Sequence, residues 1–178
     1  MALLKILTAP DPRLKERAKP VKKVDEEIRR LMADMLETMY AAPGIGLAAT
    51  QVGVLKRVIV VDIANPKEGE PPSPIKLVNP QVVKTSKNTH IYEEGCLSVP
   101  NFYEEVERPE TCTVTGLDEH GTPITIEAEG LLATCLQHEI DHLEGTLFID
   151  RISRLKRNMI VKKLTKDKKL KEAGGHNL

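Results

Sequence analysis

The chain has 178 residues, of which 40% are hydrophobic and 29% charged, and its 26 basic side chains balance 26 acidic ones. This length and composition predict one globular domain over residues 1–178 and exclude a wholly disordered chain. The neutral balance and the 3% share of aromatic residues argue against a protein that reads DNA sequence or stacks on bases.

The sequence carries no targeting signal that we recognise. No apolar run approaches the roughly 20 residues that a membrane span needs, and the first seven residues include Lys5 and lack a signal-peptide pattern. We therefore expect a cytoplasmic protein with no membrane partner. Three cysteines are too few, and odd in number, for a disulfide framework, so a reduced thiol with a metal-binding or catalytic role remains open.

The first predicted elements are a helix and a strand. Apolar residues at three- and four-residue spacing predict an amphipathic helix over 25–40, whose Met and Leu stripe packs in the core. A run rich in Val and Ile predicts a buried strand over 54–63. The Pro- and charge-rich segment 65–74 is expected to be a loop.

The second half of the chain supplies further strands and two more helices. Four segments are expected to be extended: 75–83, 89–98, 111–116 and 122–128. The last two alternate about residues 119–121, which resembles a hairpin. Helices are expected over 131–143 and 152–171. Because helices and strands are segregated rather than alternating as βαβ units, the predicted fold class is α+β with a mainly antiparallel sheet.

The most specific motif is HEIDH at residues 138–142, inside the second predicted helix. His138 and His142 lie four residues apart, so both project from one helical face and can share a divalent cation, with Glu139 beside them as a potential base. A surface helix with exposed His residues is the alternative. The flanking residues favour a metal site, because they make the helix nearly apolar all round and ionisable groups on a buried helix need partners.

A catalytic metal site needs a third protein ligand and one open position. Cys135 is a poor candidate, because helical side chains lean toward the N-terminus and its thiol points away from an ion held by the two His residues. Cys112 lies in a predicted strand and is expected to pack in the core. Cys96 follows Gly95 in an acidic segment, which argues against simple burial, but its spacing alone makes it only a hypothesis as a ligand.

The segment GIGLAATQVG at residues 44–53 superficially matches a dinucleotide-binding fingerprint. That fingerprint follows a strand and opens a helix, whereas here a predicted helix comes before and a predicted strand after, so we reject it. Two interpretations remain. The segment is either a tight turn between packed elements or a backbone lining that a ligand approaches, with Gln51 offering an amide donor.

Together, GIGLAATQ at 44–51, EGCLS at 94–98 and QHEIDH at 137–142, in this order, resemble the three signature motifs of the peptide deformylase family. The resemblance extends from the first predicted helix to the third and is closest to the bacterial-type branch. It implies mainly antiparallel sheets packed around a central metal-binding helix, with a C-terminal helix. It also implies a single catalytic domain that removes the N-formyl group from the N-terminal methionine of nascent polypeptides and releases formate.

The resemblance also implies roles for individual residues. The implied metal ligands are Cys96, His138 and His142. They would hold one divalent ion per chain, most often ferrous iron in this family, with zinc or nickel able to occupy the same ligands, and water would fill the fourth position. Glu139 would take the proton of that water and pass it to the departing amine. The Gln51 amide and the Leu97 backbone N–H would stabilise the oxyanion.

An apolar slot beside the metal would select methionine. The expected substrate-binding residues are Gly44, Ile45, Gly46, Leu131, Thr134 and Cys135. Thr134 and Cys135 reach this side because they precede His138 by four and three residues on the helix. Tyr92 is a further candidate. Asp141 is expected to face away from the His pair.

Two other classes of protein remain as alternatives. A zinc endopeptidase that shares the helix motif would take Glu144 or His176 as its third ligand, and the segment around Cys96 distinguishes the two readings. A non-catalytic module would hold a structural ion and bind RNA. Arg108 is the partner that we expect for Asp141 if that carboxylate supports the site.

The C-terminal segment 151–178 carries 10 basic and 2 acidic side chains. This excess suggests a polyanionic partner, and the family resemblance implies the ribosome near the peptide exit. A merely solvated helix face is the alternative. We expect the lysines to stay in water and the end of the segment to be a frayed tail. The residues expected to dock the first half of this helix are Ile152, Leu155, Met159 and Ile160.

Overall fold

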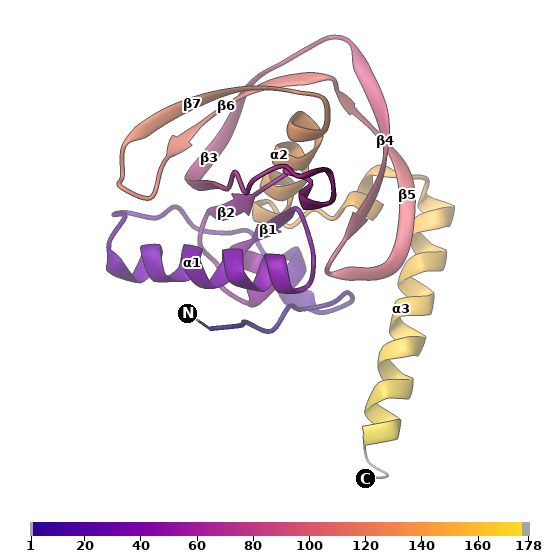
Figure 1. The fold of residues 1–178 in the computed structure, drawn as a ribbon. Helices are drawn as coiled ribbons and strands as arrows, with labels where there is room; N and C mark the ends of the chain where they lie inside the picture. Colours follow the sequence, from indigo (N-terminus) through magenta and orange to yellow (C-terminus); the bar gives the residue numbers. More distant parts are fainter. Residues whose placement is uncertain (1, 176–178) are drawn as a thin grey trace.

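The structure is a computed structural model, and it describes residues 2–175 (Figure 1). Within this range the helices are α1 (Glu26–Ala41), α2 (Gly130–Leu143) and α3 (Arg154–Gly175). Two antiparallel sheets form over the same residues, one of five strands in the order β1-β2-β3-β6-β7 and one made by β4 and β5. The strands are β1 (Gly46–Ala48), β2 (Val58–Val61), β3 (Ile75–Thr85), β4 (Thr89–Cys96), β5 (Val99–Pro109), β6 (Thr111–Leu117) and β7 (Pro123–Glu129).

Helix α1 forms where the apolar periodicity predicts it. The Asp25 side chain accepts a hydrogen bond from the backbone N–H of Ile28 and so caps the first turn. Its buried stripe includes Ile28, Met32, Met35 and Met39, which pack on one face of the large sheet against residues such as Val58 and Val60. The helix therefore contributes core packing rather than a ligand surface.

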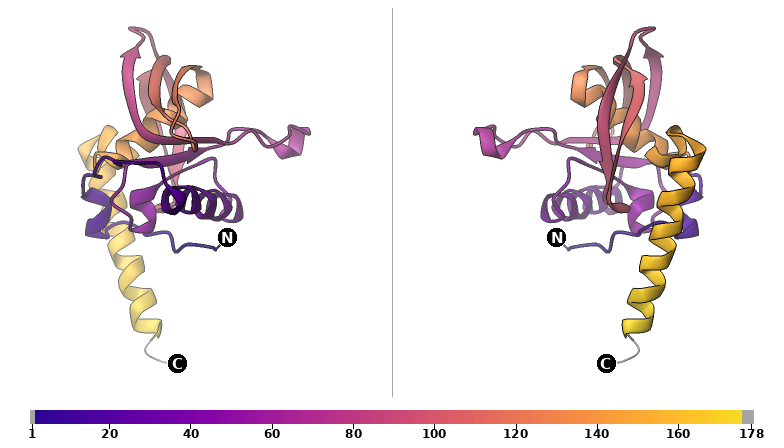
Figure 2. Two further views of the ribbon diagram at one scale, coloured as in Figure 1. Left: turned by 90° about the vertical axis from the view of Figure 1, so that its left-hand side faces the viewer. Right: turned by 90° about the vertical axis from the view of Figure 1, so that its right-hand side faces the viewer.

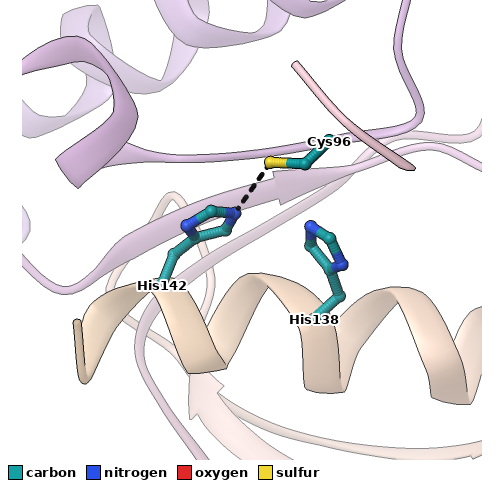
Figure 3. A group of neighbouring side chains, drawn as sticks. All are labelled: Cys96, His138 and His142. Atoms are coloured by element: carbon teal, nitrogen blue, oxygen red, sulfur yellow. Dashed lines mark hydrogen bonds between the residues drawn. The ribbon is translucent and has the colours of Figure 1, made fainter. Parts of the chain in front are cut away.

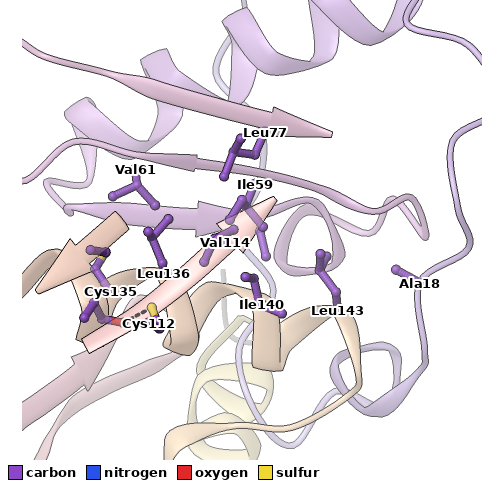
Figure 4. Close-up of a cluster of buried hydrophobic side chains, with 13 residues drawn as sticks. Ala18, Ile59, Val61, Leu77, Cys112, Val114, Cys135, Leu136, Ile140 and Leu143 are labelled. Atoms are coloured by element: carbon purple, nitrogen blue, oxygen red, sulfur yellow. Dashed lines mark hydrogen bonds between the residues drawn. The ribbon is translucent and has the colours of Figure 1, made fainter. Parts of the chain in front are cut away.

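Helix α2 is the central element, and most of its residues are buried. Figure 4 shows its apolar side chains facing the sheet, where Leu136 and Ile140 belong to the same cluster as Ile59, Leu77 and Val114. Burying a side chain of this size contributes about 1.5–3 kcal/mol. The packing of α2 on the sheet fixes the direction in which its other face points, which is the face that carries the two His residues.

The observed elements confirm the α+β prediction, including antiparallel sheets around a central helix and a C-terminal helix. The strands differ from the prediction in three places. The strand expected over 54–63 is shorter, because Gly53 has a left-handed φ of 79° and the next residue bonds back to Ala49, so β2 begins at Val58. Strands β1 and β5 were not predicted. Strand β5 pairs with β4 through a hairpin in which Cys96 lies opposite Val99.

Helix α3 extends away from the rest of the molecule (Figure 2). The prediction that Leu155 and Met159 dock it is wrong, since these side chains are 73% and 54% exposed. Ile160, which was predicted to dock, is buried together with Leu164 in a cluster with Phe148, and the predicted Ile152 packs against that cluster. Successive helical residues are about 100° apart, so Met159 points away from the face on which its neighbour Ile160 docks.

The basic side chains of α3 are mostly exposed, as expected. The frayed tail expected at the end of the chain falls on residues 176–178, which lie outside the described residues. Among the helices of residues 2–175, none is both long and apolar enough to cross a membrane.

Candidate active site

Three potential ligands meet between α2 and the end of β4 (Figure 3). One ligand atom each from Cys96, His138 and His142 lies within 4.8 Å of the others, and Cys96 Sγ is 3.3 Å from His142 Nε2. The i, i+4 spacing on α2 places the two imidazoles one turn apart, and the β4–β5 hairpin brings the thiol to them. A thiolate with two imidazoles is a donor set that suits zinc and other first-row divalent ions. These residues therefore fit a single metal ion.

The two imidazoles differ in their surroundings. Burial lowers the pKa of His142 well below its ordinary value, so its ring is neutral. Burial also disfavours the charged form of His138, but hydrogen bonds to Cys96 and Glu94 outweigh this and raise its pKa. A metal ion must therefore compete with a proton for His138, while His142 offers its lone pair freely.

A buried carboxylate orients the ring of His138. Its Nδ1 lies 2.8 Å from Oε1 of Glu94, and both Glu94 oxygens accept hydrogen bonds from Arg108, at 2.7 and 2.9 Å. Burial raises the pKa of Glu94, but the bonds from His138 and Arg108 outweigh it and lower the pKa overall. An ionised carboxylate only accepts, so Nδ1 carries the proton and Nε2 is left for a ligand.

Arg108 also holds Asp141, at 2.9 Å between Nη1 and Oδ2. The expected pairing of these two side chains is confirmed, and Asp141 faces Arg108 and Arg151 rather than the site. Glu144 pairs with Arg57 at 2.6 Å and is not a member of the ligand group. The other endopeptidase candidate, His176, lies outside the described residues.

Glu139 lies beside the ligand group and is almost fully buried. Its Oε1 is 3.8 Å from His138 Nε2, and among residues 2–175 no hydrogen-bond partner faces its Oε2. Burial is the main cause that raises the pKa of Glu139 to about 7. A Cβ at Gly46 would come within 2.7 Å of Oε1, so the glycine makes room for this carboxyl group. A carboxyl with a pKa near neutrality can both accept and donate a proton.

Gln51 approaches the site from the short 3-10 helix that follows β1. Its Oε1 accepts a hydrogen bond from the Ala48 N–H at 2.9 Å, and its Nε2 lies 3.5 Å from Cys96 Sγ. Leu97 directly follows Cys96 at the turn between β4 and β5, and its side chain packs against Gly44. One predicted oxyanion donor, Gln51, therefore contacts the thiol, and the other belongs to the residue that follows Cys96 in the chain.

A cavity of about 850 Å³ opens onto these groups. Every predicted substrate-binding residue lines it: Gly44, Ile45, Gly46, Leu131, Thr134 and Cys135. Tyr92 lines it too, and Cys135 donates its thiol proton to the Ile45 carbonyl instead of facing the ligand group. Cys112 packs in the core, as expected.

Several lining residues were not predicted. Tyr103 lies over Gly95, where a Cβ would come within 2.5 Å of the ring. The predicted residue Thr134 forms a hydrogen bond of 2.7 Å with His90, which was not predicted to lie near the site. Each of these contacts joins residues that are not neighbours in the sequence, so no local sequence pattern predicts them. The unpredicted lining residues are Ile6, Ala42, Pro43, Glu93, Glu94, Gly95, Pro100, Asn101 and Tyr103.

An α+β fold that places a thiol, two imidazoles and a buried carboxyl group at the end of one cavity is typical of a metal-dependent hydrolase. Comparison with known proteins narrows this class. The family model described as polypeptide deformylase matches residues 3–158. The chain therefore belongs to the polypeptide deformylase family, whose metal-dependent enzymes remove the N-formyl group from nascent polypeptides.

Individual relatives agree with this assignment. A peptide deformylase of Rhizobium meliloti (strain 1021) is 54% identical over 97% of this chain and 98% of its own length. The crystal structure of peptide deformylase from Ehrlichia chaffeensis in complex with actinonin has a TM-score of 0.88 at 44% identity and covers 94% of this chain and 98% of that one. A peptide deformylase from Legionella pneumophila has a TM-score of 0.86 at 49% identity, covering 96% and 98%. The endopeptidase and non-catalytic alternatives are therefore wrong.

Proposed function

We propose that this chain carries out the family's deformylation with Cys96, His138 and His142 as ligands of one divalent ion. The observation that carries the proposal is the meeting of three donor atoms within 4.8 Å at the end of the cavity that Glu139 also lines. When bound, such an ion supplies Lewis-acid chemistry, which polarises a carbonyl group and makes water acidic enough to react near neutral pH.

The remaining steps belong to side chains of the protein. Glu139 accepts the proton of the attacking water at a carboxylate oxygen and donates it to the amine that leaves. Gln51 Nε2–H and the Leu97 backbone N–H donate to the formyl oxygen as it gains negative charge. The products are formate and a peptide with a free α-amino group.

The methionine side chain occupies the apolar part of the cavity in this proposal. Ile45 and Leu131 flank its opening, and Thr134 and Cys135 form the wall on α2. Gly44 and Gly46 line the cavity where a Cβ would meet Leu97 and Glu139, so both glycines let these side chains approach the backbone.

The ligand assignment is tested by replacing each cysteine with serine. Cys96→Ser should lose most of its bound metal, because a hydroxyl is a far weaker ligand than a thiolate. Cys112→Ser and Cys135→Ser are matched controls, and both should keep a full complement of metal in elemental analysis. Equal metal content in all three purified variants would remove Cys96 from the site.

We propose ferrous iron as the native ion, with zinc and nickel able to occupy the same ligands. One thiolate and two imidazoles form a borderline-soft set that accepts all three. Protein purified without oxygen should contain iron and release formate from formyl-Met-Ala-Ser. Protein purified in this way that contains zinc or nickel but no iron would overturn this choice.

We propose the ribosome as the partner of α3 and the cytoplasm as the place of action, with residues 1–178 acting as one catalytic domain whose segment 151–178 is the basic helix and tail. The support is a row of exposed lysines on α3. Exchanging Lys162, Lys163, Lys166 and Lys169 for Glu should reduce co-sedimentation with ribosomes, and binding of the parent should fall steeply with salt. Activity on a short peptide should barely change. Salt-insensitive binding would contradict the proposal.

A further inference from the structure

Ser98 lies in the active site without a part in the steps above. It is the second residue after Cys96, and its relative exposure is 0%. Its Oγ accepts a hydrogen bond from Gln51 Nε2 at 3.0 Å. Burying a hydroxyl group without a hydrogen-bond partner costs free energy, so an unbonded serine would be unfavourable here. The hydrogen bond to Gln51 offsets that cost and places the hydroxyl against a functional side chain.

The Gln51 amide is held at both of its polar ends. Its oxygen accepts from the Ala48 N–H at 2.9 Å, which identifies oxygen and nitrogen unambiguously, because a backbone N–H cannot bond an amide nitrogen that carries two protons. Its nitrogen carries two N–H groups. One is directed to Ser98 Oγ, and the nitrogen also lies 3.5 Å from Cys96 Sγ. With one N–H fixed on the serine, the planar amide directs the other toward the metal ligands.

We propose that Ser98 is a positioning residue that holds Gln51 Nε2 in the orientation needed to donate to the forming oxyanion. This inference rests on the oxyanion role proposed for Gln51. Ser98 contacts no reacting atom itself. Without its hydroxyl, only the bond from Ala48 and the weak contact with Cys96 Sγ hold the amide, so rotation of the planar amide about the terminal torsion, which is soft in glutamine, is less restrained.

The expected consequence of Ser98→Ala is a loss in kcat of about 10-fold, with KM for formyl-Met-Ala-Ser changed less than about twofold. The loss is smaller than the roughly 10²- to 10³-fold that removal of a whole oxyanion donor costs, because the amide stays in place but is less well aimed. The metal content should not change. The backbone should also survive, since the Ser98 carbonyl keeps its bond from the Ala9 N–H at 2.8 Å.

Thr38→Val is a matched control for the loss of a buried hydroxyl. Thr38 is also buried, and its hydroxyl accepts from the Leu4 N–H and donates to the Asp34 carbonyl, in α1 and away from the cavity. This variant should lose stability without losing kcat. A similar fall in kcat in both variants would show that Ser98→Ala acts through general loosening of the fold, which would overturn the inference.

A double-mutant cycle with Gln51→Ala provides the decisive test. In the Gln51→Ala background, Ser98→Ala should change kcat less than about twofold, because nothing remains to be positioned. An equal loss in both backgrounds, or no loss in the parent, overturns the inference while the role of Gln51 stands. Unchanged kcat in Gln51→Ala alone overturns the oxyanion proposal itself. Ser98→Cys, which replaces the hydroxyl with a slightly larger and more weakly bonding thiol, should have a kcat between those of the parent and Ser98→Ala.

Discussion

Helices α2 and α3 place charged groups in opposite environments. In α2, most ionisable side chains are buried, and groups from other elements hold two of them: Glu94 bonds His138 and Arg108 bonds Asp141. In α3, the basic residues are exposed and few have a partner among the described residues. A buried charge in α2 acts as a single group with a fixed orientation. The exposed charges of α3 act together, through their summed positive charge.

The largest expected effect comes from replacing the buried carboxyl group of Glu139 on α2. Glu139→Gln should leave metal bound and lower kcat by about 10²- to 10⁴-fold, because the ligands remain while the proton carrier is lost. Formate release and elemental analysis of the same sample check this. Full activity at full metal occupancy would remove Glu139 from the mechanism and weaken the contrast between the helices.

The ion pairs give the next contrast. Arg108→Met should lower the free energy of unfolding by about 3–5 kcal/mol, because it leaves the buried Glu94 carboxylate without its cation. Arg29→Met breaks a pair with Glu26 on the surface of α1 and should cost about 0–1 kcal/mol. Denaturant titrations of the metal-free proteins measure both. Equal losses would mean that burial does not distinguish these pairs.

The next comparison is between two apolar side chains of α3, one buried and one exposed. Ile160→Ala should destabilise the protein by about 2 kcal/mol or more, because its side chain is buried against Phe148. Leu155→Ala should change stability by less than about 0.5 kcal/mol, since its side chain is mostly in water. Thermal melts of the two variants check the corrected docking face, and the reverse order would restore the original prediction.

The smallest effect concerns pH at the start of α3. Burial raises the pKa of Asp150, but bonds from Lys15 and Arg157 outweigh it and lower the pKa below its ordinary 3.8. Since the folded pKa is the lower one, the ionised carboxylate stabilises the fold above about pH 4, and this contribution disappears as pH falls through the lowered pKa. Asp150→Asn should therefore cost about 1 kcal/mol at pH 7 and progressively less below pH 4.

The control for this pH effect is Asp167→Asn on the exposed face of α3. Its unfolding free energy should follow that of the parent at every pH, within about 0.5 kcal/mol. Acid titrations of the parent and both variants, followed by circular dichroism, measure the differences. A constant gap for Asp150→Asn down to pH 2 would show that its hydrogen bonds rather than its charge stabilise the junction.

Periodic elements were predictable from the sequence, and pairings between distant segments were not. The 3.6-residue pattern located α1 and α2, and the spacing of His138 and His142 identified the face of α2 that carries two of the candidate ligands. Strand β1 has three residues and β5 has a proline at its second and last positions, so neither carries a strand pattern of its own. Both are strands because their neighbours supply hydrogen-bonding edges.

The candidate site shows the same division. The helix motif alone indicated two ligands, but the choice of Cys96 over the other cysteines came from the resemblance of its segment to a family motif. The contact between Ser98 and Gln51 joins residues 47 positions apart, and no spacing predicts it. Leu155 and Met159 of α3 were grouped with the docking residues Ile152 and Ile160 because an amphipathic pattern does not say which of two adjacent apolar rows packs on the rest of the protein.

Because Gly46 lies close to the Glu139 carboxyl group, one added methyl group at position 46 offers a way to slow the reaction. Gly46→Ala adds a methyl group whose nearest neighbours are atoms of the Glu139 side chain, so it presses on the carboxyl group. Gly46→Ala should therefore give a folded, metal-loaded protein that binds formyl-Met-Ala-Ser and turns it over slowly enough to be crystallised with the intact substrate. Such a complex would display the formyl group before cleavage, with every ligand side chain still native.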